Sequence, residues 1–192
     1  VEPLPDDHYR NVLTVVENRK GVLDVDTVKG CTLGMAAYPD GGCYGECYAN
    51  KTAHQYGIDF SVSVSRKIMG REHRGTLVRL LNTYPMNWYR IGTAGDPCHD
   101  WGNALVAIRA LRYSKKTPVI VTKHWIELSD EHLSELASLG AVINTSTSGL
   151  DSDAEIGHPV LARVAHRRDL ALDAALAEAA GNEDRVHVLE RP

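Results

Sequence analysis

The chain has 192 residues, a formal charge of −4 and a pI near 6.1. This length suits one domain over residues 1–192 with a core of its own, and the charge gives no general attraction to nucleic acid or anionic membranes. No run approaches the about eighteen apolar residues of a membrane span, and residues 1–10 are too polar for a signal peptide. The sequence therefore predicts a cytoplasmic protein with no membrane partner.

Strand and helix signals alternate along the chain. Alternating or continuous apolar runs predict strands, and amphipathic segments that end at glycine or proline predict helices. The predicted strands are 22–28, 60–65, 87–93, 118–122, 141–148 and 186–189, and the predicted helices are 47–56, 71–83, 103–112, 158–180 and one from the cap Ser129 to Gly140. Strands joined by helical crossovers pair in parallel, so this order predicts an α/β fold, either a doubly wound sheet or a barrel.

Three of the four cysteines, Cys31, Cys43 and Cys47, lie in the glycine-rich segment 30–50, directly after the first predicted strand. Thiolates are soft ligands that select zinc, copper(I) or iron-sulfur clusters. Three thiolates leave the fourth coordination position of such a site unfilled. The segment therefore predicts a metal or cluster site with an open position.

Four interpretations of this segment compete. Disulfides would need an oxidising compartment, which the polar start of the chain does not favour. Zinc usually takes two close pairs of ligands, whereas only Cys43 and Cys47 are close, and a histidine such as His54 would have to complete the site. Three unrelated buried cysteines are the third interpretation, although buried thiols rarely gather in a glycine-rich loop. An iron-sulfur cluster with one open iron is the fourth, and we favour it.

Polar groups follow several of the predicted strands. Residues 95–99 (Gly-Asp-Pro-Cys-His) follow the third strand, residues 122–124 (Thr-Lys-His) end the fourth, and residues 145–148 close the fifth. In parallel α/β folds, ligands bind where the carboxyl ends of the strands meet. The sequence thus predicts one site that joins these groups to the cysteine segment.

These residues resemble the radical S-adenosylmethionine (SAM) enzymes, in the divergent branch that includes spore photoproduct lyase-like and phage-encoded proteins. The resemblance covers most of the chain and rests on Gly42-Cys43, Cys47-Tyr48-Ala49, Gly95-Asp96-Pro97, Val121-Thr122-Lys123 and Asn144-Thr145-Ser146. The family's usual motif has its last cysteine where this chain has Asn50. Cys31, with eleven residues between it and Cys43, is the cysteine that this chain supplies instead.

The resemblance implies a parallel-stranded partial (β/α)6 barrel with a four-iron four-sulfur cluster on Cys31, Cys43 and Cys47. It also implies that the open iron binds SAM and that a donor such as flavodoxin or ferredoxin supplies an electron. SAM is then cleaved to a 5′-deoxyadenosyl radical, which abstracts hydrogen from the substrate. The substrate itself is left open between nucleic acid and another protein.

The resemblance further implies residues that contact SAM. Lys123 would pair with the SAM carboxylate, and Asp96, after Gly95, would accept hydrogen bonds from the ribose or the amine. Asn144 and Ser146 would present polar groups from the fifth strand, where a buried polar side chain needs a partner. The alternatives are a solvated lysine at Lys123 and a turn-forming aspartate at Asp96.

Cys98 is the remaining cysteine. As a catalytic residue it would donate a hydrogen atom to a substrate radical, and the alternatives are a fourth cluster ligand or a core residue. His99 and His124 flank the same predicted edge and would either position substrate or serve the structure.

A second class of function also fits the cysteines. The chain would then be a zinc- or cluster-bearing protein without turnover, which contacts nucleic acid through the basic run 66–74. That run contains Arg66, Lys67, Arg71, His73 and Arg74, a pattern more typical of a solvated helix face.

Overall fold

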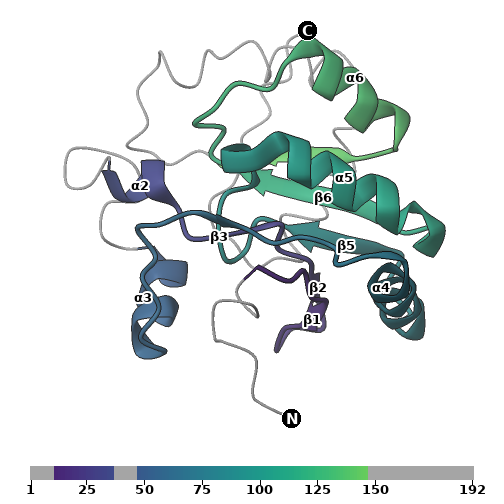
Figure 1. Cartoon of the computed structure of the whole chain (residues 1–192), viewed down its shortest axis with the longest axis horizontal. Coiled ribbons are helices and arrows are strands. Elements are labelled where there is room, and N and C mark those ends of the chain that lie inside the picture. The colour runs from purple at the N-terminus through teal and green to yellow at the C-terminus, as the bar shows by residue number, and fades with distance from the viewer. Residues whose placement is uncertain (1–10, 37–46, 147–192) are drawn as a thin grey trace, which may run out of the picture. The chain divides into compact units, whose positions relative to one another are not determined.

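The computed structural model describes residues 11–36 and 47–146 (Figure 1). These residues form a five-stranded sheet in the order β1-β2-β5-β6-β7. β1 pairs antiparallel with β2, and the other three pairings are parallel. The predicted α/β fold with a mostly parallel sheet is therefore confirmed. The strands are β1 (Val16–Glu17), β2 (Leu23–Asp24), β5 (Trp88–Ile91), β6 (Thr117–Thr122) and β7 (Val142–Thr145).

Three helices connect the parallel strands: α4 (Arg71–Thr83) precedes β5, α5 (Trp101–Leu111) joins β5 to β6, and α6 (Asp130–Ser138) joins β6 to β7. α5 contacts both α4 and α6, so the three helices form one layer. The strand order β2-β5-β6-β7 never reverses, and right-handed crossovers in one direction place successive helices on the same face. Within the described ranges the sheet is singly wound, and no closed barrel is seen.

The core lies between this helix layer and the sheet. Ile91, Ile120 and Ile143 stand in register across β5, β6 and β7, and all three are buried. Full burial of a large aliphatic side chain stabilises the fold by about 1.5–3 kcal/mol, so this row joins the three strands firmly. The helices contribute Leu77, Leu81, Ala104, Leu105, Ala107, Ile108, Leu111 and Leu136.

Side-chain caps set the start of two helices. The Ser129 hydroxyl accepts a hydrogen bond from the backbone N–H of His132 (3.2 Å), as the predicted cap requires. Asp100 Oδ1 accepts one from the backbone N–H of Asn103 (2.9 Å), so α5 begins two residues earlier than the sequence predicts. Each cap satisfies one unpaired N–H of the first turn and is worth about 1 kcal/mol.

The predicted strand 60–65 is wrong in extent and in pairing. Only β4 (Val64–Ser65) is extended, and it pairs antiparallel with β3 (Val28–Lys29) in a separate two-stranded sheet. The reason is that Phe60 buries its ring beside Cys31, and its carbonyl accepts a hydrogen bond from the Cys31 N–H (2.9 Å). The segment therefore supports the cysteine segment and not the main sheet, and the predicted strand 22–28 is divided between β2 and β3.

The predicted helix 158–180 and strand 186–189 lie outside the described residues. A single domain over residues 1–192 accordingly stays a prediction. Among the helices that the structure describes, none combines the length and the apolar character needed to cross a membrane.

Candidate functional site

Two glycines bring the cysteine segment to the carboxyl edge, the edge of the main sheet where β2, β5, β6 and β7 end. Gly30 and Gly95 form an isolated parallel bridge, and the Gly30 N–H donates to the Ala94 carbonyl (3.0 Å). A Cβ on Gly95 would lie 2.6 Å from the carbonyl oxygens of both Gly30 and Val28. Gly30 itself has a φ of +81°, which favours glycine. The close approach of the two segments therefore depends on both glycines.

The Cys31 thiol is buried at this point of contact, between Gly30 and α2 (Thr32–Ala36). The backbone N–H groups of Gly34 and Asp96 donate hydrogen bonds to its sulfur. Burial raises the pKa of Cys31 to about 11, and the neighbouring charges of Asp96 and Cys47 act in the same direction. The unligated thiol is thus protonated at neutral pH, with two N–H donors aimed at its sulfur.

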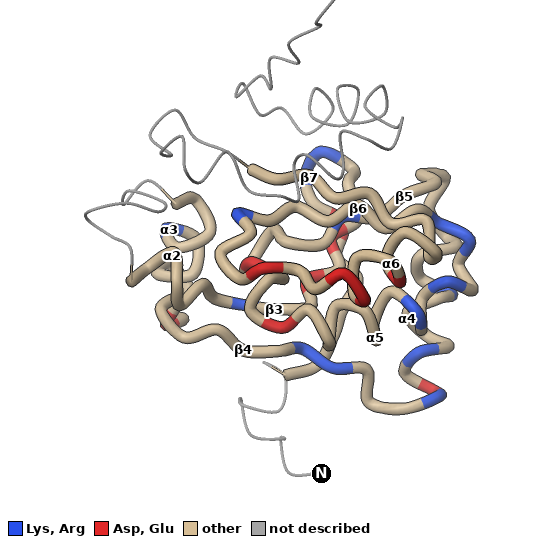
Figure 2. The backbone as a smooth tube through the Cα atoms, turned by 90° about the horizontal axis from the view of Figure 1, so that it is seen from above, with Lys and Arg blue, Asp and Glu red and all other residues tan. Residues whose placement is uncertain are grey.

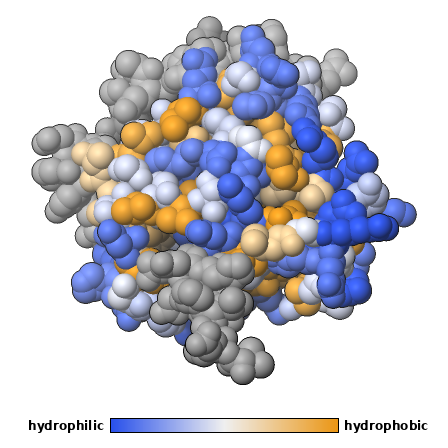
Figure 3. All heavy atoms as spheres, viewed as in Figure 1, coloured by the Kyte–Doolittle hydropathy of each residue, from blue (hydrophilic) through white to orange (hydrophobic). Residues whose placement is uncertain are grey.

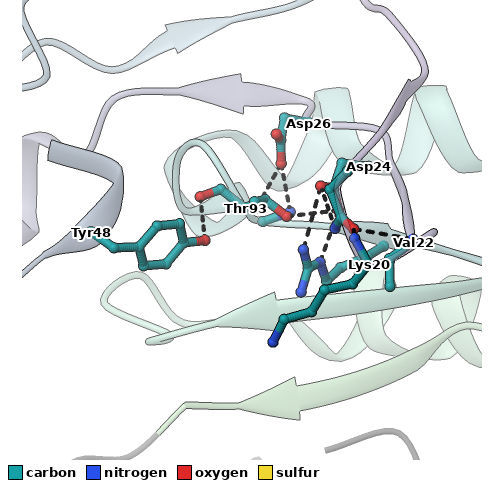
Figure 4. A network of polar contacts seen from close by, with 9 residues as sticks. Lys20, Val22, Asp24, Asp26, Tyr48 and Thr93 are labelled. Carbon is teal, nitrogen blue, oxygen red and sulfur yellow. Dashed lines mark hydrogen bonds and ion pairs between the residues drawn. The ribbon is translucent and has the colours of Figure 1, made fainter. Parts of the chain in front are cut away.

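Cys47 directly precedes α3 (Tyr48–Gln55), and its side chain packs in the same apolar cluster as Cys31. The Tyr48 hydroxyl donates to the Thr93 carbonyl (2.8 Å), which fixes the start of α3 on the chain just after β5 (Figure 4). Cys31 and Cys47, remote in the sequence, are therefore brought together. The third predicted ligand, Cys43, lies outside the described residues.

A metal site is not complete within residues 11–36 and 47–146, which hold no group of three His, Cys, Asp or Glu side chains placed to bind one ion. His54, the histidine considered for zinc, is exposed in the last turn of α3. It lies roughly 10 Å along the helix from Cys47. This histidine is therefore poorly placed to share an ion with Cys47, and a three-thiolate site needs Cys43.

Asp96 clamps the ends of β5 and β6 together. Its Oδ1 accepts hydrogen bonds from the Thr122 hydroxyl (2.6 Å) and the Cys98 N–H (3.0 Å), and its Oδ2 accepts one from the Lys123 N–H (2.7 Å). The side chain is 8% exposed. Hydrogen bonds to a carboxylate are stronger than neutral ones, so this clamp fixes Lys123 on the same edge as the cysteines. A contact between Asp96 and SAM stays a prediction.

Lys123, Asn144 and Ser146 lie on neighbouring strand ends. Asn144 is paired in register with β6, and the Ser146 N–H donates to the Thr122 carbonyl (2.8 Å) just after β7. Because Ile143 is buried in the core, the alternation along the strand turns Asn144 to the opposite face. All three predicted side chains are half-buried at the carboxyl edge.

Cys98 lies in the main core and is 1% exposed. Burial raises the pKa of its thiol above the ordinary value, and buried thiols of this kind are chemically inert. Its role as a hydrogen-atom donor stays a prediction. His124 has a structural role, because its Nε2 accepts a hydrogen bond from the Leu128 N–H (3.3 Å). His99 is different: its buried Nε2 has no hydrogen-bond partner among the described residues.

A buried polar network at the same edge was missed by the sequence analysis (Figure 4). Asp24 forms an ion pair with Arg90 (2.9 Å) and accepts a hydrogen bond from the Thr93 hydroxyl (3.0 Å). Asp26 accepts hydrogen bonds from the backbone N–H groups of Gly92 (3.1 Å) and Thr93 (2.6 Å), and burial raises its pKa. Two aspartates at alternate positions after an apolar run are the signal that could have found the network.

Comparison of the chain with protein-family models, curated proteins and solved structures gave no match. Function is therefore inferred from the residues at the carboxyl edge. These are two thiols in one apolar cluster, a clamped carboxylate, a lysine and two polar side chains at the end of the next strand.

Proposed function

We propose that this chain is a radical SAM enzyme whose four-iron four-sulfur cluster is held by Cys31, Cys43 and Cys47. The observation that carries the proposal is the meeting of Cys31 and Cys47 beside Asp96 at the carboxyl edge. Ligands bind at this edge in parallel α/β folds, and two thiols brought together from the two ends of the cysteine segment are the beginning of a soft metal site.

The donor set fits such a cluster. Hydrogen bonds from backbone N–H groups to cysteine sulfurs tune iron-sulfur centres, and the Cys31 sulfur has two such donors, from Gly34 and Asp96. Its raised pKa is not an obstacle, because a coordinated metal displaces the thiol proton. When bound and reduced, the cluster supplies the electron that cleaves SAM to methionine and a hydrogen-abstracting 5′-deoxyadenosyl radical.

The neighbouring residues have separate tasks in this proposal. The Lys123 ammonium pairs with the SAM carboxylate, and the side chains of Asn144 and Ser146 hydrogen-bond the nucleoside. Asp96, whose two oxygens already accept three hydrogen bonds, holds the strand ends so that these groups converge. The absence of a side chain at Gly95 leaves its backbone close to the cysteine segment.

We further infer that the sheet belongs to a partial (β/α)6 barrel. The support is the unreversed order β2-β5-β6-β7, with α4, α5 and α6 in one layer. A doubly wound sheet would instead reverse its order and place helices on both faces. The reaction also needs an external one-electron donor, and a flavodoxin or ferredoxin supplies electrons of this kind.

The experiment is anaerobic reconstitution with iron and sulfide, followed by reduction with dithionite in the presence of SAM. We expect 5′-deoxyadenosine and methionine by chromatography. Lys123→Ala should keep its iron but bind SAM about tenfold or more weakly in calorimetry, because a hydrogen bond to a charged group is worth about 1.5–3 kcal/mol. Lys67→Ala, which removes an exposed lysine, is the matched control.

One outcome would contradict the proposal, and a second would remove one residue from the proposed site. Reduced, cluster-loaded protein that binds no SAM would favour the non-catalytic zinc- or cluster-bearing protein. Equal SAM affinity in the Lys123 and Lys67 variants would remove Lys123 from the site while leaving the enzyme proposal open to the product assay.

A further inference from the structure

A second polar surface lies at the amino ends of the parallel strands, opposite the carboxyl edge. The turn η2 (Arg112–Ser114) ends α5, and the chain enters β6 three residues later. η2 packs against α4. Figure 2 shows Lys and Arg positions gathered around α4, and Figure 3 shows strongly hydrophilic side chains at that same end of the molecule. This end of the molecule therefore carries a cationic surface.

Tyr113 is the centre of this surface and is 57% exposed. The guanidinium carbon of Arg112 lies 5.1 Å from the ring centroid, and that of Arg74, from α4, lies 5.6 Å from it. Arg112 also donates a hydrogen bond to the Tyr113 hydroxyl (3.3 Å). Two cation–π contacts hold the aromatic ring and both guanidinium groups as one exposed platform.

A hollow of about 230 Å³ adjoins the platform. Its rim carries Arg112 and Lys115, both exposed, and Lys116. The Lys116 ammonium donates to the backbone carbonyls of Tyr84 and Met86 and so has a structural role. Lys115 has a φ of +57°, a backbone conformation that residues other than glycine rarely adopt. Tyr89, Ile108 and Leu139 also line the hollow, whose exposed surface is polar as well as apolar.

The part of the chain that the structure describes is basic, although the chain as a whole is acidic. The described ranges contain fifteen Lys and Arg against eleven Asp and Glu, a formal +4 for this part of a chain whose total is −4. Glu72 is two positions before Arg74 on α4, and residues so spaced do not face each other. The Arg112 guanidinium, helped by Arg74, lowers the pKa of Tyr113. The positive field at the ring is therefore not cancelled there.

We propose that Arg74, Arg112, Tyr113 and Lys115, named here the Tyr113 patch, bind single-stranded nucleic acid. Tyrosine rings and guanidinium planes are stacking surfaces for unpaired bases, and the surrounding cations neutralise phosphates. The hollow beside the platform, whose lining is both polar and apolar, has room for an unstacked base, which a duplex does not offer. An acidic polypeptide offers carboxylates to the cations but no unpaired bases to stack on the exposed ring.

This surface differs from the basic run 66–74 considered from the sequence. Arg66 is buried and donates a hydrogen bond to the Thr14 hydroxyl (3.0 Å), so it is not available to a polyanion. Arg74 contributes only because η2 carries Tyr113 to it from a distant part of the sequence. The proposal does not depend on the cluster or on SAM.

The test is fluorescence anisotropy of the full chain with a labelled oligothymidine of about fifteen nucleotides. At about 50 mM salt we expect Tyr113→Ala to weaken binding roughly tenfold and Tyr113→Phe to retain it, because the ring supplies the stacking surface. Tyr56→Ala is the matched control, since Tyr56 is 76% exposed at the end of α3 and should not matter.

The charge contribution is measured separately from the salt dependence. Lys115→Gln should lower the slope of log affinity against log salt by about 0.7, the value for one phosphate contact on a single strand. Lys51→Gln, on α3, should leave the slope unchanged. The proposal is overturned if the wild-type chain does not bind the oligonucleotide, or if Tyr113→Ala binds as the wild type does. If polyglutamate displaced the oligonucleotide equally well from the wild type and from Tyr113→Ala, the partner would instead be an acidic protein.

Discussion

The two ends of the parallel strands are built in opposite ways. At the carboxyl edge, buried carboxylates have fixed partners: Asp96 accepts hydrogen bonds from the Thr122 hydroxyl and the Lys123 backbone N–H, and Asp24 forms an ion pair with Arg90. At the amino end, the exposed Arg112 and Lys115 and the half-buried Arg74 surround an exposed ring. The first arrangement holds a fixed geometry, and the second offers charge to a partner.

This contrast separates the structural role of buried polar groups from the binding role of exposed cations. Buried polar groups must be paired, so their partners reveal which segments the fold needs to keep together. At the carboxyl edge those segments are the ends of β2, β5 and β6 and the cysteine segment. Exposed cations pair weakly with neighbours, so their clustering around Tyr113 indicates a binding surface and adds little to stability.

The largest effect is expected from Gly95→Ala, which should force the segments of Gly30 and Gly95 apart at the carboxyl edge. The added Cβ would meet two backbone oxygens at 2.6 Å, which cannot move without shifting β3. We expect a loss of at least about 3 kcal/mol in urea unfolding, together with reduced iron binding. Gly75→Ala, in α4 with nothing within 4 Å of its Cβ, should instead stabilise the protein by up to about 1 kcal/mol. Similar effects of the two substitutions would refute the role of close packing at Gly95.

A smaller effect is expected from Asp96→Asn. The amide nitrogen of asparagine cannot accept the hydrogen bond that Lys123 N–H now donates, so a half-buried donor loses its partner. We expect a loss of about 2 kcal/mol in urea unfolding. Asp59→Asn is the matched control, because Asp59 also accepts two hydrogen bonds, both from Ser61, but is exposed. An equal loss in both variants would show that burial of the Asp96 clamp is unimportant.

The smallest effect concerns the pH dependence of Asp26. Burial raises its pKa in the folded state above the ordinary 3.8, so the folded protein holds this proton more tightly than the unfolded chain does. The contribution of Asp26 to stability is therefore greatest at low pH and falls as the pH rises from 3.8 through the folded pKa. Because asparagine does not titrate, the cost of Asp26→Asn should shrink over this window. Urea unfolding at several pH values measures it, and a cost that grows with pH would mean that the carboxylate is stabilised by its partners.

Much of the parallel sheet could be predicted from local patterns. The apolar run at 118–122 predicts a strand, and the amphipathic pattern at 71–83 predicts a helix. The structure has β6 and α4 at these positions. The strand predicted at 60–65 was wrong because Phe60 packs on Cys31, which is distant in the sequence. The alternation of side chains in this segment is real, but it does not identify that partner. A period of two reports which side chains share a face and not which strand lies beside them.

The rule that ligands bind at strand carboxyl ends predicted that Cys31, Asp96 and Lys123 lie at one edge, where the structure has them, and their binding of SAM stays a prediction. The rule does not reveal the clamp, because a hydrogen bond from Thr122 to Asp96 joins residues 26 positions apart. Nor does it reveal the Tyr113 patch, since the contact of Arg74 with Tyr113 depends on how α4 packs against η2. Long-range side-chain pairs of this kind leave no periodic signal in one sequence.

The most direct test of the central claim is the iron content of cysteine variants after anaerobic reconstitution, with electron paramagnetic resonance of the reduced protein. We predict about four irons per chain in the wild type and a signal that changes when SAM is added. Cys31→Ser, Cys43→Ser and Cys47→Ser should each lose the cluster, while Cys98→Ser, which alters a buried core thiol, should keep its iron. A colourless protein that binds zinc, or a cluster that survives Cys31→Ser but not Cys98→Ser, would contradict the account.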